Sequence, residues 1–168
     1  DISMDFIEGL PLSHGKKVIL VVVDRLSKYA HFMAVAHPYI TISIAQLFMD
    51  TVYRLHDLPQ TIVSDRNPTF LSSFWQEFFR LQHVKLNMSI AYHRQSDGQT
   101  EVVNRCLENY LRCMASDHPK EWSLWLPLAE YWYNTNYHSS AKFTPYEIVY
   151  GQPPPLHRLP DPPQSAPL

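Results

Sequence analysis

The sequence predicts an α/β fold in which a mixed five-stranded sheet is flanked by helices. Runs rich in β-branched residues fill much of the N-terminal part of the chain, as is typical of strands. Another short β-branched run, Thr61–Ser64, follows a stretch with helical spacing, and a long amphipathic segment spans Thr100–Ala115. Strand-like and helix-like patterns that alternate in this way favour one sheet covered by helices.

Three strands are predicted near the N-terminus, over Met4–Glu8, Lys16–Asp24 and Tyr29–Val35. The first two are joined by a turn that contains proline and glycine, and the third follows closely. We therefore expect an antiparallel meander.

A helix is predicted over Thr41–Leu55, where apolar residues recur at helical spacing and Thr41 or Ser43 is the expected N-cap. Thr61–Ser64 is too short and too β-branched for a helix, so it is interpreted as a buried strand. Asp65 follows it directly, and ligands of open α/β sheets gather at such strand ends.

The rest of the chain continues the alternation and ends in a proline-rich stretch. We expect a helix over Ser72–Leu81, a strand over Val84–Met88, a polar loop over Ile90–Gly98, an aromatic helical stretch over Trp122–Tyr137 and a short helix after Pro145. Residues 1–151 are interpreted as one domain, and residues 152–168 as a linker or tail.

The helix predicted over Thr100–Ala115 has two distinct faces. Its apolar stripe consists of Val103, Cys106, Leu107, Tyr110, Leu111 and Met114. Its polar face carries Glu101, Arg105, Glu108 and Arg112. Glu101 is therefore expected to point away from the core, at the start of the helix.

Three carboxylates are the candidate catalytic and metal-binding residues: Asp5 on a strand, Asp65 at a strand end and Glu101 at a helix start. Phosphodiester chemistry with two divalent cations needs acidic ligands that converge from different segments. Hard cations such as Mg²⁺ or Mn²⁺ prefer oxygen ligands. The pattern therefore indicates a two-metal site.

Length and composition limit the alternatives. A chain of 168 residues with 45% hydrophobic content can bury the core of one domain. It has no apolar run long enough to span a membrane and no signal-peptide pattern, so no membrane partner is expected. Fourteen basic and 16 acidic residues are nearly balanced, which argues against binding nucleic acid by bulk charge alone.

Several short strings together resemble one family, the integrase catalytic cores of Gypsy-type long-terminal-repeat retrotransposons, in the retroviral integrase superfamily. The resemblance covers roughly residues 1 to 155. The strings include Met4-Asp5-Phe6-Ile7, Val63-Ser64-Asp65-Arg66, Ala91-Tyr92-His93, Asp97-Gly98-Gln99-Thr100-Glu101 and Thr144-Pro145-Tyr146-Glu147.

The resemblance implies a ribonuclease H-like fold and a metal-dependent polynucleotidyl transferase. Such an enzyme trims the DNA ends of its element and joins the 3′ hydroxyl to target DNA. By the family's motif, Asp5, Asp65 and Glu101 would hold two Mg²⁺ or Mn²⁺ ions. The family also implies element-end and target DNA as partners, a homo-oligomer and a nuclear location.

Two groups of residues are candidate DNA contacts. Tyr92, His93, Arg94 and Gln95 lie in the polar segment that leads to Glu101, where simple solvation is the alternative. Arg105 and Arg112 share the polar helix face with Glu101. They could reach phosphates, or instead form i, i+4 pairs with Glu101 and Glu108.

Two other functions remain open from the sequence. A nuclease for RNA–DNA hybrids usually takes a carboxylate from the first long helix, where this chain offers only Asp50 near the far end. A catalytically decayed or domesticated integrase-like domain would bind nucleic acid or protein without catalysis. The intact acidic triad argues against decay, although three positions depart from the family pattern: Asn67, Arg94 and Val102.

Overall fold

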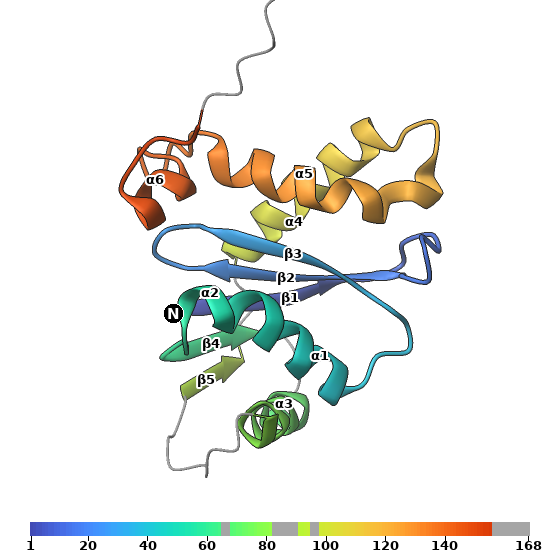
Figure 1. The fold of residues 1–168 in the computed structure, drawn as a ribbon, viewed down its shortest axis with the longest axis vertical. Coiled ribbons are helices and arrows are strands. Elements are labelled where there is room, and N and C mark those ends of the chain that lie inside the picture. Colours follow the sequence, from blue (N-terminus) through green and yellow to red (C-terminus); the bar gives the residue numbers. More distant parts are fainter. Residues whose placement is uncertain (65–67, 82–90, 95–97, 156–168) are drawn as a thin grey trace, which may run out of the picture.

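The computed structural model describes residues 1–64, 68–81, 91–94 and 98–155. Its central layer is a mixed sheet, shown with the helices above and below it in Figure 1. The strands are β1 (Ile2–Ile7), β2 (Val18–Asp24), β3 (Ala30–Val35), β4 (Thr61–Ser64) and β5 (Ala91–Arg94), in the order β3-β2-β1-β4-β5.

The strand pairing confirms the N-terminal meander and the short strand Thr61–Ser64. β1 and β2 pair antiparallel, as do β2 and β3, whereas β4 runs parallel to both β1 and β5. The predicted loop Ile90–Gly98 is wrong at its start, because Ala91–Arg94 forms β5. This segment has few β-branched residues, and its pairing with β4 overrides the local pattern. The predicted strand Val84–Met88 lies outside the described residues.

Helices cover both faces of the sheet (Figure 1). One side carries α1 (Thr41–Phe48), a π-helical turn (Met49–Tyr53), α2 (Arg54–His56) and α3 (Pro68–Leu81). The other carries α4 (Gly98–Met114), a 3₁₀ turn (Pro119–Glu121), α5 (Trp122–Thr135) and α6 (Pro145–Tyr150). Among the described residues, no helix is long and apolar enough to cross a membrane.

The predicted N-cap of the first helix is wrong. Ile40 occupies the cap position without a side-chain hydrogen bond, and neither Thr41 nor Ser43 caps the helix. The Ser43 hydroxyl instead donates to the Ile40 carbonyl at 2.7 Å. By contrast, α6 begins with a capping box, in which Thr144 accepts from the Glu147 amide and the Glu147 carboxylate accepts from the Thr144 amide.

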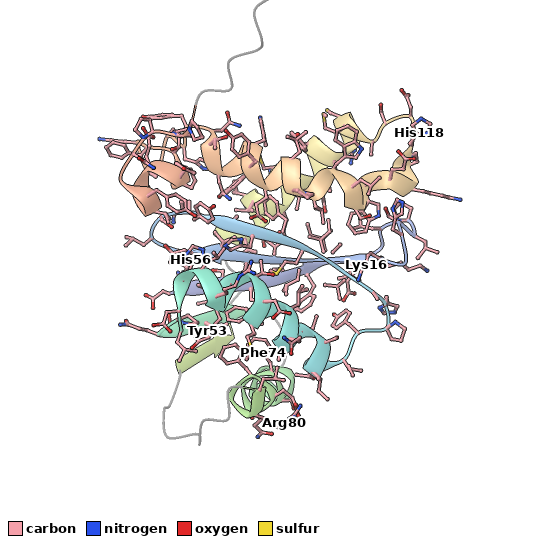
Figure 2. All side chains as sticks on the ribbon, in the orientation of Figure 1. Lys16, Tyr53, His56, Phe74, Arg80 and His118 are labelled. Atoms are coloured by element: carbon pink, nitrogen blue, oxygen red, sulfur yellow. The ribbon has the colours of Figure 1, made fainter. Side chains whose placement is uncertain are left out.

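The strand alternation divides the core into two clusters. Met4 and Phe6 of β1 face α1 and α3, where Phe48, Phe74 and Phe78 are fully buried; Figure 2 labels Phe74 in this layer. Ile7 faces the other side, with the buried residues of α4 and α5. Asp5 and Ile7 are two positions apart on β1, so their side chains point to the same face of the sheet. The carboxylate of Asp5 therefore faces α4.

A chain of polar side chains ties α2 to the sheet and to α5. His31 of β3 is buried, with Nδ1 3.0 Å from Glu130 Oε1 and Nε2 2.8 Å from Nε2 of His56. The carboxylate requires a proton on His31 Nδ1, so in the neutral pair His56 Nε2–H donates to His31. Asp24 and Tyr29 also line this junction.

The His56 junction predicts a pH dependence of stability. Partial burial of the imidazole, and secondarily the charge on His31, lower the pKa of His56 below 6.5, and Asp24 and Glu130 oppose this. The unfolded chain therefore takes up the proton first as the pH falls, so this contribution to stability is present above about pH 6.5 and is lost below it. Between about pH 7.5 and about pH 5.5, His56→Gln should lose less thermal stability than the wild type.

Exposed His118, near the 3₁₀ turn, offers a matched control. His118→Gln should keep the pH dependence of the wild type in the same thermal unfolding series. If His56→Gln also kept it, the junction would not be the source of the effect.

Candidate functional site

The carboxylate of Asp5 is held by two hydrogen bonds. The Phe6 amide donates to Oδ1 at 2.8 Å, and Nδ2 of Asn104 donates to Oδ2 at 2.6 Å. The second bond joins the central strand β1 to the second turn of α4. The side chain of Asp5 is therefore fixed against the helix that carries Glu101.

Glu101 lies in the first turn of α4 and is exposed, as the sequence predicted. The helix is anchored by its buried stripe of Val103, Leu107 and Leu111. Residues three positions apart share a helix face, so Glu101 emerges on the same side as Asn104, one turn nearer the helix start. A carboxylate at this end of a helix is also favoured by the helix dipole.

Asp65, the third predicted carboxylate, lies outside the described residues. β4 ends at Ser64, directly before it, and runs parallel to β1 with Ser3 opposite Val63. Within the described ranges, the structure contains no group of three or more His, Cys, Asp or Glu residues that could hold a metal ion. The structure thus connects Asp5 with the start of α4, and the complete triad stays a prediction.

Four of the candidate DNA contacts lie at or after β5. Tyr92, His93 and Arg94 form part of this strand, and β5 lies beside β4 with Arg94 opposite Ser64. Their side chains, and all of Gln95, fall outside what the structure describes. β5 therefore ends beside the end of β4.

Arg105 and Arg112 are exposed on α4, as predicted. Within the part of the chain that the structure describes, neither forms an ion pair with Glu101 or Glu108. The alternative of i, i+4 pairs on this face is therefore not seen. Both residues lie on α4, the helix that carries Glu101 in its first turn.

Sequence reasoning missed Asn104. Its position three residues after Glu101 was a usable signal, because that spacing places both side chains on one face of a helix. What the sequence could not indicate is its contact with Asp5, 99 residues away along the chain. Asn104 Oδ1 is buried and has no hydrogen-bond partner in the described structure.

Comparison with known sequences identifies relatives but no matching family model. The chain is 36% identical over 158 residues to the Transposon Tf2-3 polyprotein of Schizosaccharomyces pombe, and to the same extent to the Tf2-4 polyprotein. These alignments cover 94% of this chain and 12% of each relative. The chain thus spans about an eighth of the length of the curated relatives it matches.

Solved structures show the same fold. The HTLV-2 integrase catalytic core domain in complex with magnesium superposes with a TM-score of 0.62 and 21% identity, over 87% of this chain and 94% of that chain. The BIV integrase catalytic core gives a TM-score of 0.60 and 22% identity, over 88% of this chain and 91% of that chain. A simian T-cell lymphotropic virus intasome superposes with a TM-score of 0.65 and 20% sequence identity, over 99% of this chain and 58% of that chain.

These neighbours confirm the predicted ribonuclease H-like fold, in which a mixed sheet is flanked by helices. The sequence relatives are retrotransposon polyproteins at an identity and coverage that establish kinship. The chain therefore belongs to the family of the Tf2 retrotransposon polyproteins, and its fold is that of retroviral integrase catalytic cores.

Proposed function

We propose that this chain is the catalytic core of a metal-dependent polynucleotidyl transferase. It would trim the DNA ends of its element and join the new 3′ hydroxyl to target DNA. The observation that carries the proposal is the Asn104–Asp5 hydrogen bond of 2.6 Å, which ties a carboxylate on the central strand to the helix that carries Glu101 in its first turn. Two of the three predicted acidic residues thus belong to one connected unit.

The donor chemistry of this unit fits a hard divalent cation. Asp5 and Glu101 offer carboxylate oxygens, and Asp65 would supply a third carboxylate. Each oxygen of Asp5 accepts one hydrogen bond, so each retains lone-pair capacity. The buried Oδ1 of Asn104 adds an acceptor without a partner. Asp5, Asp65 and Glu101 would therefore hold two Mg²⁺ or Mn²⁺ ions, consistent with the magnesium in the HTLV-2 core.

When bound, such ions activate the attacking hydroxyl and stabilise the leaving oxygen of the phosphodiester. The protein's own part is to hold its carboxylates in place and to bind DNA. Asp5 is held through Asn104, and Glu101 is held by the buried stripe of α4. Neither a serine nor a tyrosine nucleophile is required.

The proposed partners are element-end DNA and target DNA, bound by a homo-oligomer. Related cores are described in dimeric and trimeric forms, and a further neighbour is an intasome. Tyr92, His93, Arg94 and Gln95 would approach DNA beside the ends of β4 and β5. A nuclear location follows from integration into chromosomal DNA and belongs to the same proposal.

Strand transfer in Mg²⁺ tests the proposal. The integrase that carries this core should join duplexes with the element's own end sequences to a target plasmid, and a chelator should abolish the reaction. DNA binding without joining, at any Mg²⁺ or Mn²⁺ concentration, would favour the decayed or domesticated domain instead.

DNA affinity should depend on the two exposed arginines of α4. Replacing both Arg105 and Arg112 by alanine should weaken DNA binding and reduce the slope of log affinity against log salt by about two, since each phosphate contact contributes about one. Fluorescence anisotropy over a salt series measures both quantities.

Arg54→Ala is the matched control, because Arg54 is exposed on α2, on the opposite side of the sheet (Figure 1). Its affinity and salt slope should stay close to those of the wild type. An unchanged slope in the α4 double variant would remove this helix face from the DNA interface.

A further inference from the structure

Asn104 is held in one orientation by its neighbour. Its Nδ2 lies 2.6 Å from Asp5 Oδ2, a short hydrogen bond to a charged acceptor. With the amide reversed, its oxygen would face the carboxylate, and two acceptors would repel each other. Asp5 therefore determines where the other end of the amide points.

The other end of the Asn104 amide is its oxygen, Oδ1, which receives no hydrogen bond in the described structure. Oδ1 of Asn104 is buried and has no partner among the described residues. Buried acceptors in folded proteins are nearly always satisfied, and an exception points to a missing water, ion or ligand. A carboxylate cannot satisfy this acceptor, so the missing group is either a cation or a donor that brings an N–H or O–H.

The hydration shell of a divalent cation supplies such a donor. Mg²⁺ keeps several of its waters when carboxylates bind it, and these waters donate hydrogen bonds to groups around the ligands. Asn104 is in direct contact with Asp5 and one helical turn from Glu101, the two described carboxylates of the proposed site. No other described side chain donates to Asp5.

We propose that Asn104 is a positioning residue with two roles. Its Nδ2 orients the Asp5 carboxylate, and its Oδ1 accepts a hydrogen bond from a water in the hydration shell of the cation that Asp5 binds. This inference rests on the proposed function, because it needs a divalent cation at Asp5. It predicts that Asn104 contributes to cation affinity without itself being a ligand.

The test measures cation binding rather than catalysis. Asn104→Leu has a similar size but neither donor nor acceptor, and losing such an outer contact typically weakens metal binding 10–100-fold. Mg²⁺ affinity should fall by about this factor in titration calorimetry of the metal-free protein. The enhancement of water-proton relaxation by bound Mn²⁺ should change too, because it reports the hydration of the ion.

Asn109→Leu is the matched control, since Asn109 is exposed on the same helix. Its Mg²⁺ affinity and Mn²⁺ relaxation should equal those of the wild type. A purely structural clamp between β1 and α4 would change the stability of Asn104→Leu without changing either cation readout. Mg²⁺ affinity within twofold of the wild type in Asn104→Leu would therefore overturn the proposal.

Asn104→Asp keeps the test decisive if the leucine variant fails to fold. It would place a second carboxylate against Asp5, and a bound cation would offset their repulsion. Mg²⁺ should therefore raise the unfolding midpoint of Asn104→Asp by more than that of the wild type. An equal or smaller rise would overturn the proposal.

Mg²⁺ binding by the wild type and by Asp5→Asn shows whether the proposed function fails or only the proposed role of Asn104 fails. If the wild type binds no Mg²⁺, or if Asp5→Asn binds it as well as the wild type does, the metal site itself is wrong and both proposals fall. If Asp5→Asn loses binding but Asn104→Leu keeps it, only the role of Asn104 is rejected.

Discussion

Glu101→Gln should abolish DNA strand transfer and leave the fold intact. The amide keeps the shape of the side chain but loses the charge that offsets a divalent cation. Such cations contribute several kcal/mol of transition-state stabilisation, and about 1.4 kcal/mol corresponds to tenfold in rate. A loss of at least about a thousandfold is therefore expected, measured with element-end DNA in Mg²⁺.

The fold should tolerate this change because Glu101 is exposed in the first turn of α4. Losing its interaction with the helix dipole costs about 0.3–1 kcal/mol, which lower repulsion from the other carboxylates of the proposed site would partly offset. Glu108→Gln is the control, because Glu108 is exposed on the same polar face two turns further along. Normal strand transfer by Glu101→Gln at matched protein concentration would refute the assignment of the triad.

The sequence predicted those elements whose structure is determined by local pattern. Apolar residues of α4 recur at helical spacing, so the burial of Val103, Leu107 and Leu111 and the outward position of Glu101 followed from spacing. Met114, at the end of the predicted apolar stripe, is instead exposed. The N-terminal meander followed from β-branched runs separated by turns. These elements carry Asp5 and Glu101, so two of the proposed ligands could be assigned to their elements in advance.

Features that depend on distant parts of the chain could not be predicted. Ala91–Arg94 appeared to be a loop because it contains no β-branched residue, and its pairing with the neighbouring β4 makes it a strand. The Asn104–Asp5 bond joins residues 99 positions apart, and no local repeat encodes it. The N-terminus of α1 could not be predicted from local sequence either. Thr41 and Ser43 both carry hydroxyl groups suited to capping, but Ile40 occupies the N-cap position.

Phe48→Ala should cause the largest loss of stability among the changes considered. Phe48 is fully buried at the end of α1, with its ring centroid 5.4 Å from that of Phe74 and 5.6 Å from that of Phe78, both edge-on. Truncating a buried phenylalanine typically costs 3–5 kcal/mol, and edge-to-face pairs add to this. Small domains are stable by only about 5–15 kcal/mol, so much of the total would be lost.

Urea denaturation measures this loss as a lower midpoint at an unchanged slope. Ile42→Ala on the same helix is the control, because Ile42 is largely exposed and its truncation should cost little. Phe48 packs on the face of β1 opposite to Asp5, so Mg²⁺ binding to the folded fraction should survive the change. A midpoint close to that of the wild type would mean that α1 and α3 do not share the aromatic core described above.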